Sequence, residues 1–140
     1  MVWRPDPKGA QALGVFARVM AAPPDRNLVS FSADAGMTLA APLPGRDSDT
    51  AGIGFGVAKV SGNASALDRD TALYSGTNYP VRTVETFFEV TYQYQIVPWW
   101  QVQPDFQYVL RPSGGIPNPT QPSRLIGNEA VFGLRTVVTF

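Results

Sequence analysis

Apolar and polar residues alternate with a period of two along several segments of this sequence. In segment 84–97 the even positions are nearly all apolar or aromatic, whereas the odd positions are mostly Glu, Thr and Gln. Segment 99–111 repeats the pattern directly after a tight turn at Pro98. Successive side chains of a β-strand point to opposite faces, so the alternation predicts two strands whose faces meet different environments. The short connection predicts that these strands form a hairpin.

The same alternation predicts further strands elsewhere in the chain. The last segment, 129–140, also shows it, and three upstream segments show it less strongly, namely 11–20, 28–40 and 51–60. No segment has the apolar spacing of a helix, so we expect an all-β, antiparallel fold of about six strands. The connections at 61–83 and 112–128 are long and rich in Gly, Pro, Asn and Ser, whereas 41–50 and the turn at Pro98 are shorter. Short turns on one side and longer loops on the other are typical of transmembrane β-barrels.

The hairpin around Pro98 also predicts which residues pair. If residues 97–99 form the turn, Ile96 faces Trp100, and the pairing continues along both strands. The expected partners further along are Val90 with Phe106, Glu89 with Gln107, and Glu85 with Arg111.

The alternation by itself fits two classes of protein. One is a soluble β-barrel or sandwich that binds a small ligand, with its apolar face packed inward. The other is a transmembrane β-barrel with its apolar face toward lipid. Three features favour the second class. The polar face is rich in Gln, while the only lysines are Lys8 and Lys59; aromatic residues lie near both ends of the apolar face; and the last residue is the aromatic Phe140.

In a transmembrane barrel the polar face lines a water-filled lumen. We expect the opposite face to contact lipid through Phe88, Val90, Tyr92, Phe106, Tyr108, Leu134 and Val138. The lumen-facing candidates are Arg18, Asp34, Glu85, Glu89, Gln93, Gln103, Asp105, Gln107, Arg111 and Arg135. Amide and carboxylate groups of this kind can hydrogen-bond to the hydroxyls of neutral sugars.

Composition excludes several other functions. The net charge is zero, which gives no electrostatic basis for binding nucleic acid. The chain has no Cys and no His, so it lacks thiolate ligands and the commonest general base. We find no catalytic constellation and expect no enzyme activity, no cofactor and no metal. No apolar stretch is long enough to predict a transmembrane helix. Asp47 and Asp49 are expected to cap turns or carry surface charge, and Asp68 to be solvated in its loop.

Short motifs spread along nearly the whole chain resemble the carbohydrate-selective porin family, the glucose-inducible type of outer-membrane porin. They are residues 14–19, 24–29, 45–50, 89–93, 103–108 and 132–135. The resemblance implies a monomeric barrel of about sixteen strands, within the range of bacterial barrels, that lets sugars diffuse across the bacterial outer membrane. It implies that residues 1–140 are the C-terminal part of such a barrel, with the N-terminal strands absent and an open curved sheet left.

The resemblance also implies partners. They are outer-membrane lipid, mono- or oligosaccharides in the full pore, and the barrel-assembly machinery, which would act on the C-terminal strand with Phe140 as its assembly signal. No nucleic acid is expected among them.

Overall fold

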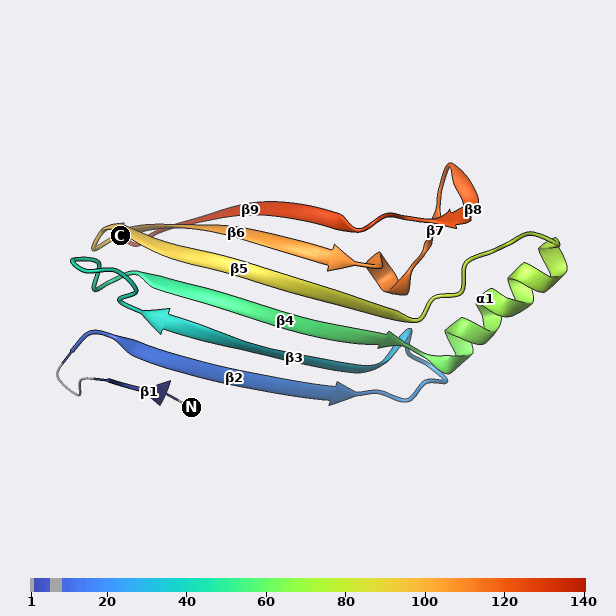
Figure 1. Cartoon of the computed structure of the whole chain (residues 1–140), viewed down its shortest axis with the longest axis horizontal. Helices are drawn as coiled ribbons and strands as arrows, with labels where there is room; N and C mark the ends of the chain where they lie inside the picture. The colour runs from blue at the N-terminus through green and yellow to red at the C-terminus, as the bar shows by residue number, and fades with distance from the viewer. Residues whose placement is uncertain (1, 6–8) are drawn as a thin grey trace.

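The computed structural model describes residues 2–5 and 9–140, so Lys8 lies outside the described residues. The chain forms one antiparallel sheet in the order β1-β2-β3-β4-β5-β6-β9, in which consecutive strands are neighbours (Figure 1). The strands are β1 Val2–Trp3, β2 Ala12–Ala21, β3 Val29–Ala40, β4 Thr50–Val60, β5 Val84–Val97, β6 Trp100–Leu110 and β9 Glu129–Val138.

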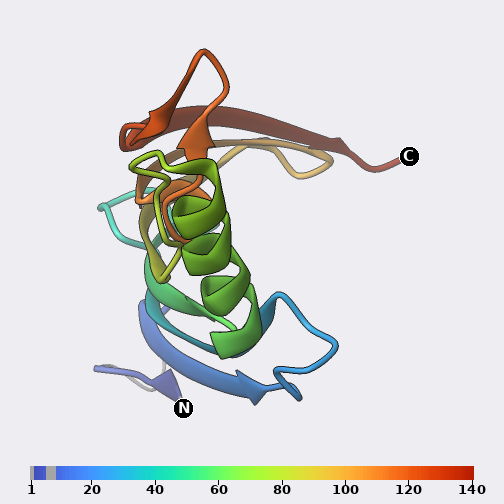
Figure 2. The ribbon, with the colours of Figure 1, turned by 90° about the vertical axis from the view of Figure 1, so that its right-hand side faces the viewer.

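The sheet is open and curved. Viewed along the strands, β2 and β9 lie on opposite arms of the curve (Figure 2), and helix α1 (Gly62–Ser75) extends beyond the strand ends at one end of the sheet (Figure 1). The longer connections gather at one end of the strands and the shorter turns at the other (Figure 1). The connection from β6 to β9 holds the short helix η1 (Pro112–Gly114) and a small hairpin of β7 (Pro117–Asn118) and β8 (Gln121–Leu125).

The predicted all-β fold and the six predicted strands are confirmed, with boundaries that differ by one or two residues. The predicted last strand, 129–140, extends too far, because β9 ends at Val138. Phe140 lies beyond the strand with its side chain fully exposed. The very short β1 and the β7–β8 hairpin were not predicted, since two to five residues are too few for an alternation to be recognised.

The predicted register of the β5–β6 hairpin is confirmed in its middle and wrong at both ends. Val90 pairs with Phe106, and Glu89 pairs with Gln107. Near the turn Val97, not Ile96, faces Trp100, because the register shifts after Gln95. At the far end the ladder stops at the pair Thr86–Leu110.

The expected contact between Glu85 and Arg111 is therefore not formed. Arg111 leaves the strand with a left-handed backbone, φ 54°. The carboxylate of Glu85 instead accepts a hydrogen bond from the backbone N–H of Ser113 in η1. The cross-strand rule fails here because the strand ends one residue earlier than the alternation suggested.

Helix α1 contradicts the expectation that the chain has no helix and that 61–83 is an irregular loop. The hydroxyl of Ser61 caps its first turn by accepting a hydrogen bond from the N–H of Ala64, 3.3 Å away. Gly76, with φ 62°, ends the helix in the left-handed conformation that favours glycine. The helix lacks a buried apolar stripe, since Leu67, Leu73 and Tyr74 are exposed, and this is why apolar spacing did not predict it.

Few side chains are buried in this single layer. Among the described residues the buried apolar ones are Ala41 and Val60. Large apolar side chains on one face are instead exposed, for example Phe132 at 79% and Leu134 at 75%. An exposed apolar face of this extent indicates a surface that another apolar phase or partner covers. In the part of the chain described, no helix is long and apolar enough to cross a membrane.

Candidate functional site

The face opposite these exposed apolar residues carries the polar side chains, and we call it the polar face. It consists of the even positions of β2, β3 and β4 and the odd positions of β5, β6 and β9. The backbone pairings align these positions in rows across the sheet. One row, for instance, runs Phe16, Gly36, Gly54, Glu89 and Gln107.

Most of the predicted lumen-facing residues share this face, and several of them contact one another. Arg18 on β2 donates to Asp34 on β3, with Nη2 to Oδ1 at 2.9 Å. Gln107 on β6 donates to Glu89 on β5 at 3.2 Å. Their charges and amides are thus paired along the sheet rather than scattered.

Of the remaining predicted residues, Gln93, Gln103, Asp105 and Arg135 lie within the strands of this face, whereas Glu85 and Arg111 lie at or beyond the strand ends. Gln103 lies opposite Arg135 of β9 and donates to the hydroxyl of Thr91 at 2.8 Å. Gln93 lies opposite Thr50, and Asp105 lies opposite Gly133. Glu85 lies at the end of β5 against η1, and Arg111 lies outside the strands, so the structure does not bring these two to the main group.

Sequence reasoning missed the aromatic and glycine positions of the polar face. The rings of Phe16 and Phe87 lie on this face, over Gly36 and Gly56 respectively, where an added Cβ would collide with them. Together with Gly52 and Gly54 these positions form a floor without side chains along β3 and β4. A cavity of about 290 Å³ lies over this floor. Two aromatic residues at otherwise polar positions were the signal in the sequence that could have found it.

The short turn between β3 and β4 holds a second polar cluster, centred on Asp49. Its side chain is 1% exposed and accepts hydrogen bonds from Arg46 at 2.7 and 2.8 Å, from the hydroxyl of Tyr92 at 2.8 Å and from the N–H of Gln95 at 2.9 Å. Arg46 also lies over the ring of Tyr94, 3.9 Å from its centroid. The expectation that Asp49 carries surface charge is wrong.

Burial alone would raise the pKa of the Asp49 carboxyl. The hydrogen bonds from Arg46, Gln95 and Tyr92 outweigh that effect, so its pKa lies below the ordinary value. The carboxylate therefore stays charged and ties the turn to the neighbouring strand β5. This cluster stabilises the turn and offers no free group to a ligand.

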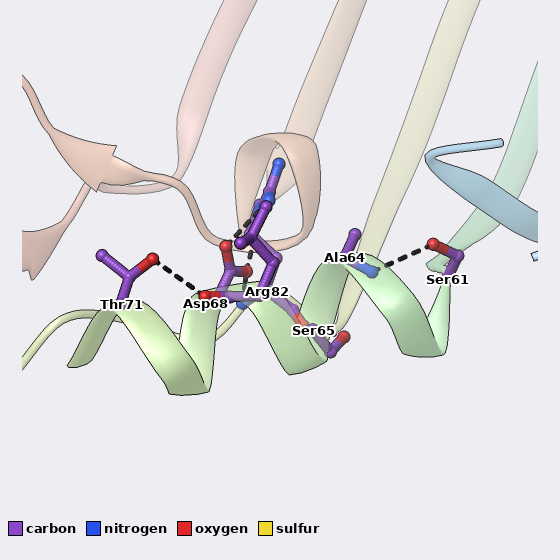
Figure 3. A network of polar contacts seen from close by, with 7 residues as sticks. Ser61, Ala64, Ser65, Asp68, Thr71 and Arg82 are labelled. Atoms are coloured by element: carbon purple, nitrogen blue, oxygen red, sulfur yellow. Dashed lines mark hydrogen bonds and ion pairs between the residues drawn. The ribbon is translucent and has the colours of Figure 1, made fainter. Parts of the chain in front are cut away.

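A third cluster attaches helix α1 to the segment that follows it (Figure 3). Asp68 accepts three hydrogen bonds from Arg82, from the backbone N at 3.0 Å and from Nε and Nη2 at 2.8 Å each. Ser65 donates to the carbonyl of Arg82 at 2.8 Å. Burial would raise the pKa of Asp68, but the bonds from Arg82 outweigh it and lower the pKa. Asp68 is therefore not the solvated loop residue that the sequence suggested.

The fold and the two faces define a class of protein. A curved antiparallel sheet with an exposed apolar face, a polar face opposite, and short turns at one end is the wall of a transmembrane β-barrel. A soluble barrel or sandwich would pack its apolar face into a core, and nothing in the described residues favours that alternative.

Comparisons with known proteins give the family. The family model "Carbohydrate-selective porin, OprB family" matches residues 1–140, so the chain belongs to this family, and its place is the bacterial outer membrane. A solved structure titled "High pH structure of Pseudomonas putida OprB" matches with a TM-score of 0.81 and 22% identity. The match covers 94% of this chain and 31% of that one, so the chain spans about a third of the porin's length. A search of the curated proteins found no match.

Proposed function

We propose that this chain forms part of the wall of an outer-membrane porin through which carbohydrates diffuse passively. The observation that carries the proposal is the polar face, where charges of both signs and amides occur together and several of them are paired. Neutral, hydroxyl-rich solutes can exchange hydrogen bonds with such groups. Mixed charge disfavours strong ion selectivity. Diffusion through such a lumen needs no catalytic group and no cofactor.

In this proposal the polar face lines the lumen and the apolar face contacts lipid. Support comes from the loops at the end of the sheet. η1 contacts the polar face through Glu85, and an added Cβ at Gly114 would meet the side chain of Val60, which also belongs to that face. Helix α1 extends from the same end of the sheet (Figure 1). Loops that fold inward over a lumen are common in outer-membrane barrels.

The proposal includes the position of the chain in the barrel. We place residues 1–140 at its C-terminal end, as the family resemblance implies, so that other strands complete the wall beyond β1 and β9. Unpaired edges cost several kcal/mol per backbone group in lipid, which gives a strong reason for such closure. Phe140 is proposed as a signal for the barrel-assembly machinery.

The absence of Cys from the sequence makes the orientation of the faces easy to test. Phe88 and Glu89 are neighbours on β5 that lie on opposite faces. Each would be replaced singly by Cys in the protein produced in the outer membrane of a porin-deficient host. We expect Glu89→Cys to react with a charged, water-soluble thiol reagent and Phe88→Cys to be protected from it. The reverse pattern would refute the assignment of the faces.

Transport is tested separately. Vesicles that contain the complete barrel of which this chain forms part should swell in isotonic solutions of monosaccharides, and more slowly as the sugar becomes larger. Vesicles prepared from the host without the protein are the control. Swelling that does not differ between the two preparations would overturn the proposed transport function.

A further inference from the structure

The polar face carries aromatic rings at one place. Among the described strand residues of this face the aromatic ones are Phe16 on β2 and Phe87 on β5, three strands apart. Each ring reaches toward β4, because Phe16 lies over Gly36 and Phe87 lies over Gly56. Between the two rings lies Gly54. There an added Cβ would meet only the Cβ of Glu89, 3.9 Å away, so the backbone is open to the cavity.

Polar groups surround this bare floor. The residues that line the cavity of about 290 Å³ include both phenylalanines, Gly52 and Gly54 of β4, the Arg18–Asp34 pair, Glu89 and Thr91. The side chain of Arg18 is 65% exposed, so its guanidinium stays accessible although it is paired with Asp34. Apolar walls with a few convergent polar groups are the usual composition of a small-molecule site.

We propose that this cavity is a binding subsite for one ring of a neutral sugar on the wall of the pore. A sugar ring has an apolar C–H surface and a rim of hydroxyls, which match the aromatic faces and the polar rim of the cavity. The carboxylates accept hydrogen bonds from hydroxyls and Arg18 donates to them. Glycine within a strand often marks a place where a ligand approaches the backbone closely.

The charges distinguish a sugar from other small solutes. Two carboxylates face one guanidinium, which disfavours a phosphate or another anion. Asp34 is already engaged with Arg18, so a single unpaired cation has less to gain than a ligand with many hydroxyls. The inference rests on the proposed function and adds to it the place in the pore wall where the sugar binds during its passage.

The test compares two neighbouring phenylalanines on β5. Phe87→Ala removes one wall of the cavity, and Phe88→Ala makes the same change on the opposite face. Saturation-transfer NMR with D-glucose and a glucose disaccharide on the protein in detergent micelles gives the half-saturating concentration. We expect Phe87→Ala to raise it about fivefold, which corresponds to about 1 kcal/mol of aromatic contact. Phe88→Ala should leave it within twofold of the unchanged protein.

Two further variants guard against a folding defect. Gly54→Val fills the floor and should also weaken binding, whereas Phe87→Tyr keeps the ring and should retain it. Variants are compared only when their heat-modifiable gel mobility shows a folded barrel. Equal effects of Phe87→Ala and Phe88→Ala would overturn the subsite, and so would competition by tetramethylammonium chloride, which would indicate a cation site.

Failure of the subsite and failure of the proposed function are distinguishable. If vesicles swell in sugar but no saturable binding is found, the subsite is wrong and the transport function stands. If vesicles do not swell in any sugar, the transport function itself is wrong.

Discussion

Replacing Asp68 by Asn should loosen helix α1 without affecting the sheet. The carboxylate receives three hydrogen bonds from Arg82, and the two side chains are only 4% and 21% exposed. Asparagine keeps one acceptor oxygen but replaces the other with an NH₂ group, which cannot accept from the guanidinium. It also removes the negative charge that compensates Arg82.

The size of the effect follows from burial. Removing one partner of a buried ion pair costs about 3–5 kcal/mol. Arg82 is one-fifth exposed and can be partly hydrated once it is freed, so we take a lower value, about 2–3 kcal/mol for the local opening of α1. At about 1.4 kcal/mol per factor of ten, the population of the open helix should rise about 30- to 150-fold.

Amide hydrogen exchange, followed by mass spectrometry on the protein in detergent micelles, measures this population directly. Peptides from 61–83 should exchange faster by that factor, while peptides from β5 and β6 should not change. Asp70→Asn is the matched control, because it makes the same chemical change at an exposed position of the same helix. Equal exchange in the two variants would refute the assignment of the Asp68–Arg82 pair as the attachment of α1.

Two further predictions concern the buried carboxylates Asp68 and Asp49. The folded pKa of Asp68 lies below its ordinary value of about 3.9, so its stabilisation of α1 is complete above that pH and is lost as the pH falls through the folded pKa. Hydrogen-exchange protection of residues 61–83, corrected for intrinsic exchange rates, should therefore be constant from about pH 7 to 5 and decline only below about pH 4. A decline near neutral pH would contradict this reasoning. Asp49→Asn should loosen the β3–β4 turn and speed tryptic cleavage after Arg46 several-fold. The control is Asp47→Asn, the same change at an exposed residue of the same turn. Equal cleavage rates in the two variants would show that Asp49 does not hold the turn.

The strands could be predicted because alternation is a local property. In β5 every even position from Phe88 to Ile96 is apolar, and a two-residue period requires no knowledge of the rest of the chain. The tight turn at Pro98 then determined the register in the middle of the hairpin. The prediction failed at Ile96, where the register shifts, and at Arg111, where the strand has already ended. Such irregularities depend on how the neighbouring strands and loops pack.

Helix α1 shows what a periodicity analysis overlooks. Ser61, followed by an alanine-containing segment and then Gly76, is a start and stop signal that could have been recognised. The missing apolar stripe hid the helix, because α1 is attached to its neighbours by the polar pair Asp68–Arg82 and not by a buried apolar face.

By itself, the sequence determined the strands, their two faces and the family. It could not show that Asp49 is buried, because Tyr92 and Gln95, which donate hydrogen bonds to its carboxylate, lie more than forty residues away along the chain. Nor could it show that Phe16 and Phe87 approach the same glycine floor, which needs the pairing of four strands. Alternation can be recognised from consecutive residues, whereas a shared cavity or a compensated charge depends on contacts between residues that are distant in the sequence. Those contacts exist only once the sheet has formed.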